Sequence, residues 1–509
     1  MIGNSLGAYC FIKGCIYLLQ SVTPLSILCF VSTSITGPSS NPAVLALQIW
    51  AVAETVFFIF IYLPRKRFLQ KPASHPTDLS RDDRRELFRR CQETISEPET
   101  YLVKWFKGAP IEEIKRDNVK EFYCWAFLNR DAWGPEDDEE LEGYADATEK
   151  MLGRKLEPGR GSARALRLTL DEVTMSTHRS LLWYLCIGVV DTLTSVCMLR
   201  WFHFHSLPYR RFFTVFPFRP LLLFSTHRTP GKTVTYWHRQ HNSPTHLPVL
   251  FVHGIGIGLY PYVNFLSEID EDIGVIAVEI MPVSFRITSE ALQREAMCQE
   301  VLAIVRQHGW DRFILVSHSY GSIISTHLLS HQSIAPLIGP VVLLDPVSFL
   351  LHLPDVAYNF TCRLPKRANE HQLYYFASMD MGVSHTLFRR FFWSENILWK
   401  ADLGDRRLTV VLGGKDLIVD TTAVGRYLTQ PDRPASFSSQ SLEKAGNGAD
   451  EEWKHRRWTG KGIDLLWFED LDHAQVFDSR RDRGRVIGVI EAYSLQESQP
   501  SASSNGVAH

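Results

Sequence analysis

The sequence predicts an α/β protein with a mostly parallel central sheet and helices on both faces. Apolar N-terminal helices and a charged helical region are expected to precede the sheet. From residue 233 onward, short apolar runs rich in β-branched residues alternate with amphipathic stretches. This alternation is typical of strand–helix–strand units, whose parallel strands are buried on both faces. By contrast, the first 63 residues contain only two charged side chains, Lys13 and Glu54.

Seven strands are expected in the C-terminal half, each a short apolar run bounded by polar or turn-forming residues. They are predicted at residues 233–237, 249–252, 274–278, 313–316, 341–344, 409–412 and 465–468. Helices are predicted between them at 289–307 and 320–329, where apolar residues recur with helical spacing. Strands that alternate with helices in this way predict one large α/β domain over residues 231–494.

Composition excludes several classes of protein. The 509 residues carry 54 basic and 56 acidic side chains, so the net charge of −2 argues against nucleic acid as the partner. A hydrophobic content of 45% with 12% aromatics is too high for a disordered chain. The nine cysteines include no C-x-x-C pair, which argues against a disulfide framework or a zinc site. No cofactor and no metal are expected.

The low charge of residues 1–63 predicts a membrane anchor of two helices. Residues 14–35 and 43–63 are apolar runs of 22 and 21 residues, and about 20 helical residues cross a bilayer core. The second run ends in Pro64-Arg-Lys-Arg67, so the positive-inside rule places the following chain in the cytoplasm. The membrane lipid bilayer is therefore an expected partner. A cleaved signal sequence over the first run, or two buried helices of a soluble domain, are the alternatives.

Residues 181–230 form a third apolar segment. Its first 19 residues form an apolar run that contains Asp191 and is followed by alternating aromatic and basic residues. This pattern suits a span, a helix in the headgroup layer, or aromatics packed under a neighbouring domain. If the segment does not span, the whole chain after residue 64 lies on the cytoplasmic side.

Four further regions complete the predicted organisation. Residues 64–180 are charged and helical. Residues 355–403 interrupt the α/β pattern with an insertion rich in aromatics, which is expected to form a cap, with a structural excursion as the alternative. Residues 430–462 are rich in Ser, Gly, Lys and Glu and are expected to be a flexible insertion. Residues 495–509 are expected to be a disordered tail.

The main chemical motif is Ser317-His-Ser319-Tyr-Gly321, which lies between a hydrophobic strand and an amphipathic helix. Small residues two positions on either side of a serine allow the tight strand–helix turn known as the nucleophile elbow, G-x-S-x-G. Here Ser317 replaces the first glycine. The setting between strand and helix makes Ser319 the predicted nucleophile.

With this elbow, residues 233–494 resemble the α/β-hydrolase superfamily, specifically its serine esterases and lipases. The strand at 249–252 is followed by His253-Gly254-Ile255-Gly256, similar to the family's histidine–glycine turn. The resemblance implies that the backbone N–H groups of Ile255 and Tyr320 form an oxyanion hole. A serine at the elbow argues against the dehalogenase and epoxide-hydrolase branches, which use an aspartate there.

The resemblance also implies an acid and a histidine, each after a later strand. Asp416 follows the strand at 409–412, and His473 follows the strand at 465–468, in the Ser, Asp, His order of this fold. Asp420 is close enough in sequence to compete as the acid. Asp345, at the end of the preceding strand, is a further alternative, because some lipases carry their acid there.

These features together predict a membrane-anchored serine hydrolase that acts on a hydrophobic ester. Ser319 would attack the acyl carbonyl, His473 would act as general base, and Asp416 would orient the histidine. An acyltransferase or thioesterase with the same three residues is one alternative. A non-catalytic scaffold that retains the fold is another, although it has no physical need for all three residues.

Overall fold

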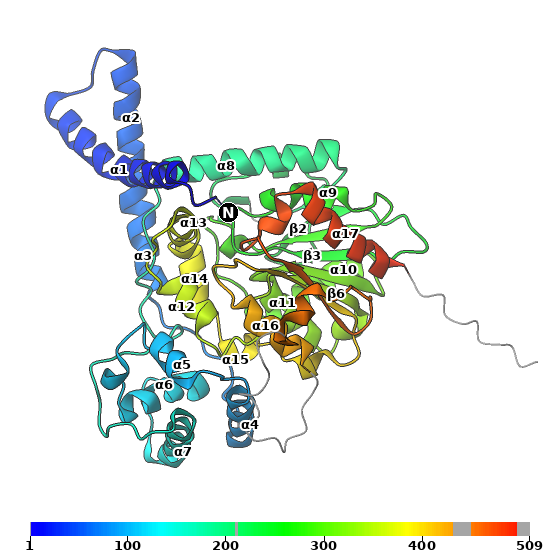
Figure 1. Cartoon of the computed structure of the whole chain (residues 1–509). Coiled ribbons are helices and arrows are strands. Elements are labelled where there is room, and N and C mark those ends of the chain that lie inside the picture. The colour runs from blue at the N-terminus through cyan, green and yellow to red at the C-terminus, as the bar shows by residue number, and fades with distance from the viewer. Residues whose placement is uncertain (1, 209–211, 431–448, 496–509) are drawn as a thin grey trace, which may run out of the picture.

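A computed structural model describes residues 2–208, 212–430 and 449–495, and its centre is one eight-stranded sheet (Figure 1). The strands occur in the order β1-β2-β4-β3-β5-β6-β7-β8. β2 pairs antiparallel with β1 and β4, and β3 to β8 pair parallel with one another. This topology, with a strand–turn–helix after β5, is the α/β-hydrolase fold, so the predicted fold class is confirmed. The strands are β1 (His205–Leu207), β2 (Thr235–Arg239), β3 (Val249–Val252), β4 (Val275–Glu279), β5 (Phe313–His318), β6 (Ile338–Leu344), β7 (Leu408–Gly413) and β8 (Ile463–Phe468).

Each of the seven predicted strands is present, with ends within three residues of the expected ones. β1 was not predicted, because a strand of only three residues carries no measurable alternation of apolar and polar side chains. His205–Leu207 pairs with Tyr236–His238, so the sheet begins before the predicted boundary at residue 231. Part of the 181–230 segment therefore belongs to the α/β domain.

Helices cover both faces of the sheet and create two cores. α9 (Val263–Glu268) and α17 (Arg480–Ser494) contribute to the cluster on one face, which includes Phe265 and Ile490. α10 (Arg294–Gln307), α11 (Gly321–Ser330) and α16 (Thr421–Thr429) contribute to the cluster on the other face. Because the parallel strands are buried on both sides, they are almost continuously apolar.

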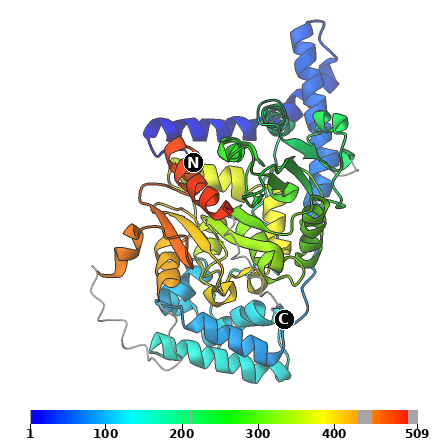
Figure 2. The same cartoon turned by 90° about the vertical axis from the view of Figure 1, so that its right-hand side faces the viewer.

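The charged region before the sheet forms a helical unit that packs against the second core. Its helices are α4 (Arg81–Gln92), α5 (Pro98–Trp105), α6 (Arg116–Leu128) and α7 (Pro135–Leu152). Ser80 caps α4 by accepting a hydrogen bond from the backbone N–H of Asp83, as its sequence position predicts. The same hydrophobic cluster contains residues of α6 and of the sheet, so this unit is part of the folded body (Figure 2).

The insertion between β6 and β7 folds into short helices beside the sheet (Figure 1). These are α12 (Asp355–Thr361), α13 (Ala368–Gln372), α14 (Met381–Arg389) and α15 (Trp393–Asn396), with a π-helical stretch at Leu373–Ser378. α12 lies next to α5 of the helical unit, and α13 lies next to the first N-terminal helix. We call residues 355–403 the cap. Of the predicted 430–462 insertion, 431–448 lie outside the described residues, and Ala449–His455 form a 3-10 helix. The predicted tail, apart from Leu495, also lies outside them.

The N-terminal 69 residues form two long apolar helices. α1 (Leu6–Thr36) is followed by α2 (Pro42–Phe57), which continues through a π-helical turn at Phe58–Tyr62 into α3 (Leu63–Leu69). By length and composition, Leu6–Thr36 and Pro42–Leu69 are each able to cross a membrane, and most of their apolar surface is exposed. Both helices therefore fit the anchor expected from the sequence.

The third apolar segment forms α8 (Leu181–Val196), which runs across one end of the molecule (Figure 1). Asp191 of α8 is buried and ion-paired with Arg219 at 2.9 Å and Arg286 at 2.7 Å. Arg219 also holds Glu279 of β4 through two hydrogen bonds of 2.8 and 2.9 Å. Because breaking a buried ion pair leaves an uncompensated charge, α8 is fixed to the sheet domain.

Candidate active site

The turn between β5 and α11 holds Ser319 in a strained backbone conformation. Its φ is +50°, in the left-handed region that non-glycine residues rarely adopt. A Cβ on Gly321 would lie 2.4 Å from the carbonyl oxygen of Val252, so only glycine allows the helix to approach β3 this closely. Ser317 is accommodated in place of a glycine because its Oγ accepts a 2.8 Å hydrogen bond from Ser325. The sequence motif thus forms the sharp elbow that it predicts.

The structure brings the three predicted reactive side chains into one hydrogen-bonded series. Nε2 of His473 lies 2.8 Å from Oγ of Ser319, and Nδ1 lies 2.7 Å from Oδ2 of Asp416. The other Asp416 oxygen accepts the backbone N–H groups of Ile418 and Val419 at 2.7 and 2.9 Å. These bonds fix the carboxylate, so the histidine has one defined orientation between acid and serine.

The two alternative acids occupy other roles. Asp420 caps α16 by accepting the backbone N–H of Ala423. Asp345 accepts the backbone N–H groups of Gly413 at 3.3 Å and Ala474 at 2.8 Å. Asp416 is therefore the acid that hydrogen-bonds His473.

The two predicted oxyanion-hole residues line the same cavity as Ser319. Within the described residues, neither the N–H of Ile255 nor that of Tyr320 donates a hydrogen bond. A Cβ on Gly254 would lie 2.8 Å from Cβ of Ser319, which shows how closely this turn approaches the serine. His253 holds the turn: its Nε2 accepts the N–H of Ile280 at 2.9 Å, and its Nδ1 donates to the Gly254 carbonyl at 2.6 Å.

Electrostatics around His473 favour its charged form. Burial alone would lower its pKa, but the charge and hydrogen bond of Asp416, assisted by Asp345 and Asp472, raise the pKa to about 9. Burial also outweighs the other effects on His318, whose pKa is lowered. The ring centroids of the two histidines are 5.2 Å apart, so a neutral His318 avoids repulsion with a charged His473.

Asp345, Asp416 and His473 are also the group of described residues that comes nearest to a metal-ligand set, with ligand atoms within 4.8 Å of one another. Nδ1 of His473 is already bonded to Asp416, and both oxygens of Asp345 accept backbone N–H groups. These atoms are therefore engaged in hydrogen bonds that orient the histidine.

A narrow cavity of about 50 Å³ begins at Ser319. Its wall is almost entirely apolar. The cap contributes Phe360, Leu387, Phe391 and Trp393, and the loop after β6 contributes Val347 and Leu351. An apolar wall around a reactive hydroxyl suits a hydrocarbon group next to the bond that reacts.

Sequence reasoning missed part of this wall. Trp105, Trp125 and Leu168 of the helical unit also line the cavity. Trp393 of the cap donates a 2.8 Å hydrogen bond to the carbonyl of Ala126, which joins the cap to α6. From the sequence, the apolar side chains of this charged region predict only a local hydrophobic core. Their position beside the Ser319 cavity depends on packing between segments that are distant in the sequence.

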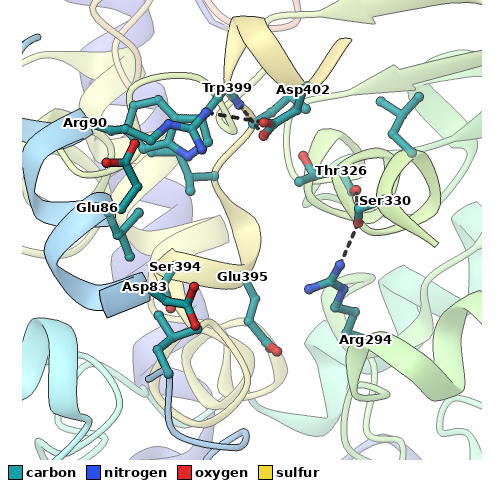
Figure 3. Close-up of a pocket in the computed structure, with 15 residues that line it drawn as sticks. Asp83, Glu86, Arg90, Arg294, Thr326, Ser330, Ser394, Glu395, Trp399 and Asp402 are labelled. Atoms are coloured by element: carbon teal, nitrogen blue, oxygen red, sulfur yellow. Dashed lines mark hydrogen bonds and ion pairs between the residues drawn. The ribbon is translucent and has the colours of Figure 1, made fainter. Parts of the chain in front are cut away.

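A second, wider hollow of about 390 Å³ lies where α4, the cap, α10 and α11 meet (Figure 3). Arg90 of α4 lies over the Trp399 ring at 4.4 Å and pairs with Asp402 at 3.3 Å. Across the hollow, Arg294 donates a 2.7 Å hydrogen bond to Ser330. No residue of the Ser319–His473–Asp416 series lines this hollow. The contacts of Arg90 hold the helical unit against the cap.

Comparisons with known proteins add only distant likenesses. No protein-family model matches the chain. No curated protein matches it either. Among solved structures, it is similar to naproxen esterase (carboxylesterase NP) from Bacillus subtilis, at 12% identity and a TM-score of 0.36, over 59% of this chain and 96% of that one.

Two further solved structures are equally distant. A membrane phospholipase A, described as a bacterial virulence factor, aligns at 11% identity and a TM-score of 0.36, over 62% of this chain and 94% of that one. A haloalkane dehalogenase loop variant from Bradyrhizobium elkanii aligns at 11% identity and a TM-score of 0.33, over 51% and 94%. Likenesses this distant carry no inference about activity, so the fold rests on the strand topology of this chain.

Proposed function

We propose that this protein is a membrane-anchored serine hydrolase that cleaves carboxylic esters of lipids or other hydrophobic acyl compounds. The observation that carries the proposal is the hydrogen-bonded series Ser319–His473–Asp416 at the elbow. A serine, a histidine and an acid in this arrangement supply a nucleophile, a general base and a group that orients the base.

The reaction proceeds through an acyl-enzyme. Oγ of Ser319 attacks the ester carbonyl as Nε2 of His473 accepts the hydroxyl proton, and Asp416 stabilises the resulting imidazolium. The N–H groups of Ile255 and Tyr320 stabilise the negative charge that develops on the carbonyl oxygen. His473 then protonates the departing alcohol, and water activated by the same histidine releases the acid and restores Ser319.

Two features support a hydrophobic substrate. The cavity at Ser319 is walled by aromatic and aliphatic side chains. The two N-terminal helices expose enough apolar surface to hold the enzyme at a membrane, where hydrophobic esters are concentrated. At about 50 Å³ the cavity is far smaller than the ~300 Å³ or more of common ligand sites, so a long acyl chain requires the cap to shift.

The test is activity-based labelling in membranes that contain the full chain. A fluorophosphonate probe is expected to label the wild-type protein and to leave Ser319→Ala unlabelled. Ser317→Ala is a matched control, since it changes a buried serine two residues away and keeps the hydroxyl of Ser319. Folded wild-type protein without Ser319-dependent labelling would contradict the proposal. Release of free acid from a hydrophobic ester then tests hydrolysis itself.

A further inference from the structure

A single buried carboxylate joins the two N-terminal helices to the start of α8. Glu54 of α2 is fully buried, although it lies within an apolar helix. Its Oε1 accepts a 2.6 Å hydrogen bond from Thr23 of α1, and its Oε2 accepts a 2.7 Å bond from the backbone N–H of Leu181 at the start of α8. Glu54 therefore fixes both helices at the level of α8.

Beyond this level the two helices form a short hairpin. The free part of α1 runs from Thr23 to Thr36, 14 residues, and that of α2 from Pro42 to Glu54, 13 residues. At 1.5 Å per residue each leg is roughly 20 Å long. The hydrocarbon core of a bilayer is about 30 Å thick, so neither leg is long enough to cross it.

The remaining parts of both helices pack one side against the folded domain and leave the other side exposed. In the first half of α1, Ile12 and Ile16 pack on Tyr375 of the cap. After Glu54, Phe57 packs against Tyr184 and Phe216 at ring distances of 5.5 and 5.7 Å. α1 contains Pro24, which disrupts helical hydrogen bonding. Figures 1 and 2 show α1 turning from the face of the molecule into the projecting hairpin.

The face from which the hairpin projects is apolar. α8 buries Asp191 toward the sheet domain but exposes Leu185, Val189, Leu193 and Val196, which lie on one side of the helix. On the first half of α1, Leu6, Phe11 and Leu18 are each more than 60% exposed. A helix whose outward face is apolar is the reverse of a normal surface helix and marks an interaction surface.

Exposed aromatics extend this face. Phe213 and Phe224 are each 81% exposed, and Phe218 is 46% exposed. A series of ring contacts, each 5.5 to 5.7 Å, connects Phe57 of α2 to Phe216, Phe218 and Phe213. The exposed aromatics are thus continuous with the anchor. We call α8, the first half of α1 and residues 213–224 the membrane face.

We propose that the α1–α2 hairpin is buried in one leaflet of a phospholipid bilayer, and that the membrane face lies in the headgroup layer of that same leaflet. The proposal rests on the membrane anchoring proposed above and goes beyond it by fixing depth and orientation. It differs from the expected pair of full spans in that the hairpin turns within one leaflet and does not reach the other side of the bilayer. The folded domain then contacts the lipid surface through the membrane face.

Depth-dependent fluorescence quenching tests the proposal. The full chain carries a fluorescent amino acid at Ser40 in the hairpin turn, at Val189 on the membrane face, or at Leu79. Leu79 is two residues before α4, which lies at the opposite end of the molecule from the hairpin (Figure 1). It is reconstituted into vesicles of phosphatidylcholine and phosphatidylserine at about 3:1. Loss of fluorescence at Ser40 is expected to be greatest with a nitroxide at the end of the acyl chain, and at Val189 with one near the headgroup. Leu79 is expected to keep its fluorescence.

Other outcomes distinguish failure of the single-leaflet hairpin, of the membrane face and of membrane anchoring itself. If Pro42–Leu69 crosses the bilayer, Ser40 is quenched by iodide trapped inside the vesicles, which overturns the single-leaflet hairpin. If Val189 keeps its fluorescence while Ser40 loses it, the proposal that the membrane face lies in the headgroup layer is wrong. If no position is quenched by any lipid, the anchoring itself fails. None of these signals requires hydrolysis, so a failure of the proposed esterase activity leaves them unchanged.

Discussion

The side-chain amide of Asn369 donates a 2.8 Å hydrogen bond to Oδ2 of Asp472, which joins cap helix α13 to the loop that carries His473. The other carboxylate oxygen of Asp472 accepts the backbone N–H of His473 at 2.7 Å and that of Leu417 at 3.1 Å. One carboxylate thus connects the cap, the histidine loop and the loop that carries Asp416. Asp472 and Asn369 are positioning residues, because they act on the reactive groups through other atoms.

Asn369→Ala is expected to lower kcat while the protein remains folded. Loss of this bond leaves Asp472 without its contact to the cap, and small displacements of reactive groups reduce rates by about 10- to 100-fold. Asn396→Ala is the matched control, because Asn396 is also a buried cap asparagine but hydrogen-bonds His327 instead. Steady-state kinetics and thermal unfolding of both variants check this. An equal loss of kcat in both would show that Asn369 acts only through general stability.

Gly254→Ala is expected to reduce kcat/KM by about 10²–10³-fold, the usual cost of losing one oxyanion donor. A Cβ at this position would lie 2.7 Å from Nδ1 of His318 and 2.8 Å from Cβ of Ser319, so the turn that carries the Ile255 N–H must move. Gly256→Ala is the control, since a Cβ there meets nothing within 4 Å. Hydrolysis of a short soluble ester measures both variants, and wild-type activity in Gly254→Ala would contradict the assigned oxyanion hole.

Leu168→Ala is expected to change substrate preference toward bulkier acyl groups. Leu168 is buried and lines the cavity, so its truncation widens the space next to Ser319. Leu166→Ala removes the same atoms from a buried leucine two residues away that does not line the cavity. Both variants should lose about 2–5 kcal/mol of unfolding free energy. Relative kcat/KM over esters of increasing acyl size should change only in Leu168→Ala; parallel profiles in the two variants would be evidence against the proposed acyl cavity.

The midpoint of the pH dependence of kcat/KM is expected to lie well above pH 7. Neutral His473 is the form that accepts the proton of Ser319, so activity falls as pH decreases through the pKa of this histidine. That pKa is raised from 6.5 to about 9, which puts the half-maximum near pH 9. Asp345→Asn removes a carboxylate that raises the pKa, so the midpoint should move to lower pH.

Asp420→Asn is the control for this titration, because asparagine caps a helix as well as aspartate does and Asp420 is not among the groups with the largest effects on the pKa of His473. Its midpoint should equal that of the wild type. A wild-type midpoint at or below pH 6.5 would show that the neighbouring carboxylates do not raise the pKa of His473.

Local sequence patterns predicted the sheet and placed Ser319, Asp416 and His473 at the ends of its strands. Ser319, Asp416 and His473 each follow a strand, and parallel strands end at the same edge of a sheet, so their proximity followed from the fold. The structure brings them within hydrogen-bonding distance, while their roles in a reaction stay predictions. Asp472 directly precedes His473 in the sequence, but nothing in the sequence identified Asn369 as its hydrogen-bond partner.

Contacts between distant segments could not be predicted from local sequence patterns. Asn369 in the cap meets Asp472 across more than a hundred residues, and no periodicity encodes such a pair. The same holds for Glu54, whose hydrogen bonds to Thr23 of α1 and to Leu181 at the start of α8 also join distant segments. Local propensity sets each helix, whereas tertiary packing sets where it ends and what it touches.

The wall that Trp105, Trp125 and Leu168 add to the cavity at Ser319 has a consequence for how this protein can be divided and altered. A fragment that starts at residue 231 would keep the elbow and the histidine loop but lose β1 and one side of the cavity. The helical unit cannot be exchanged as an independent module. Substitutions of Trp105, Trp125 or Leu168 should therefore change acyl selectivity while Ser319, His473 and Asp416 stay unchanged.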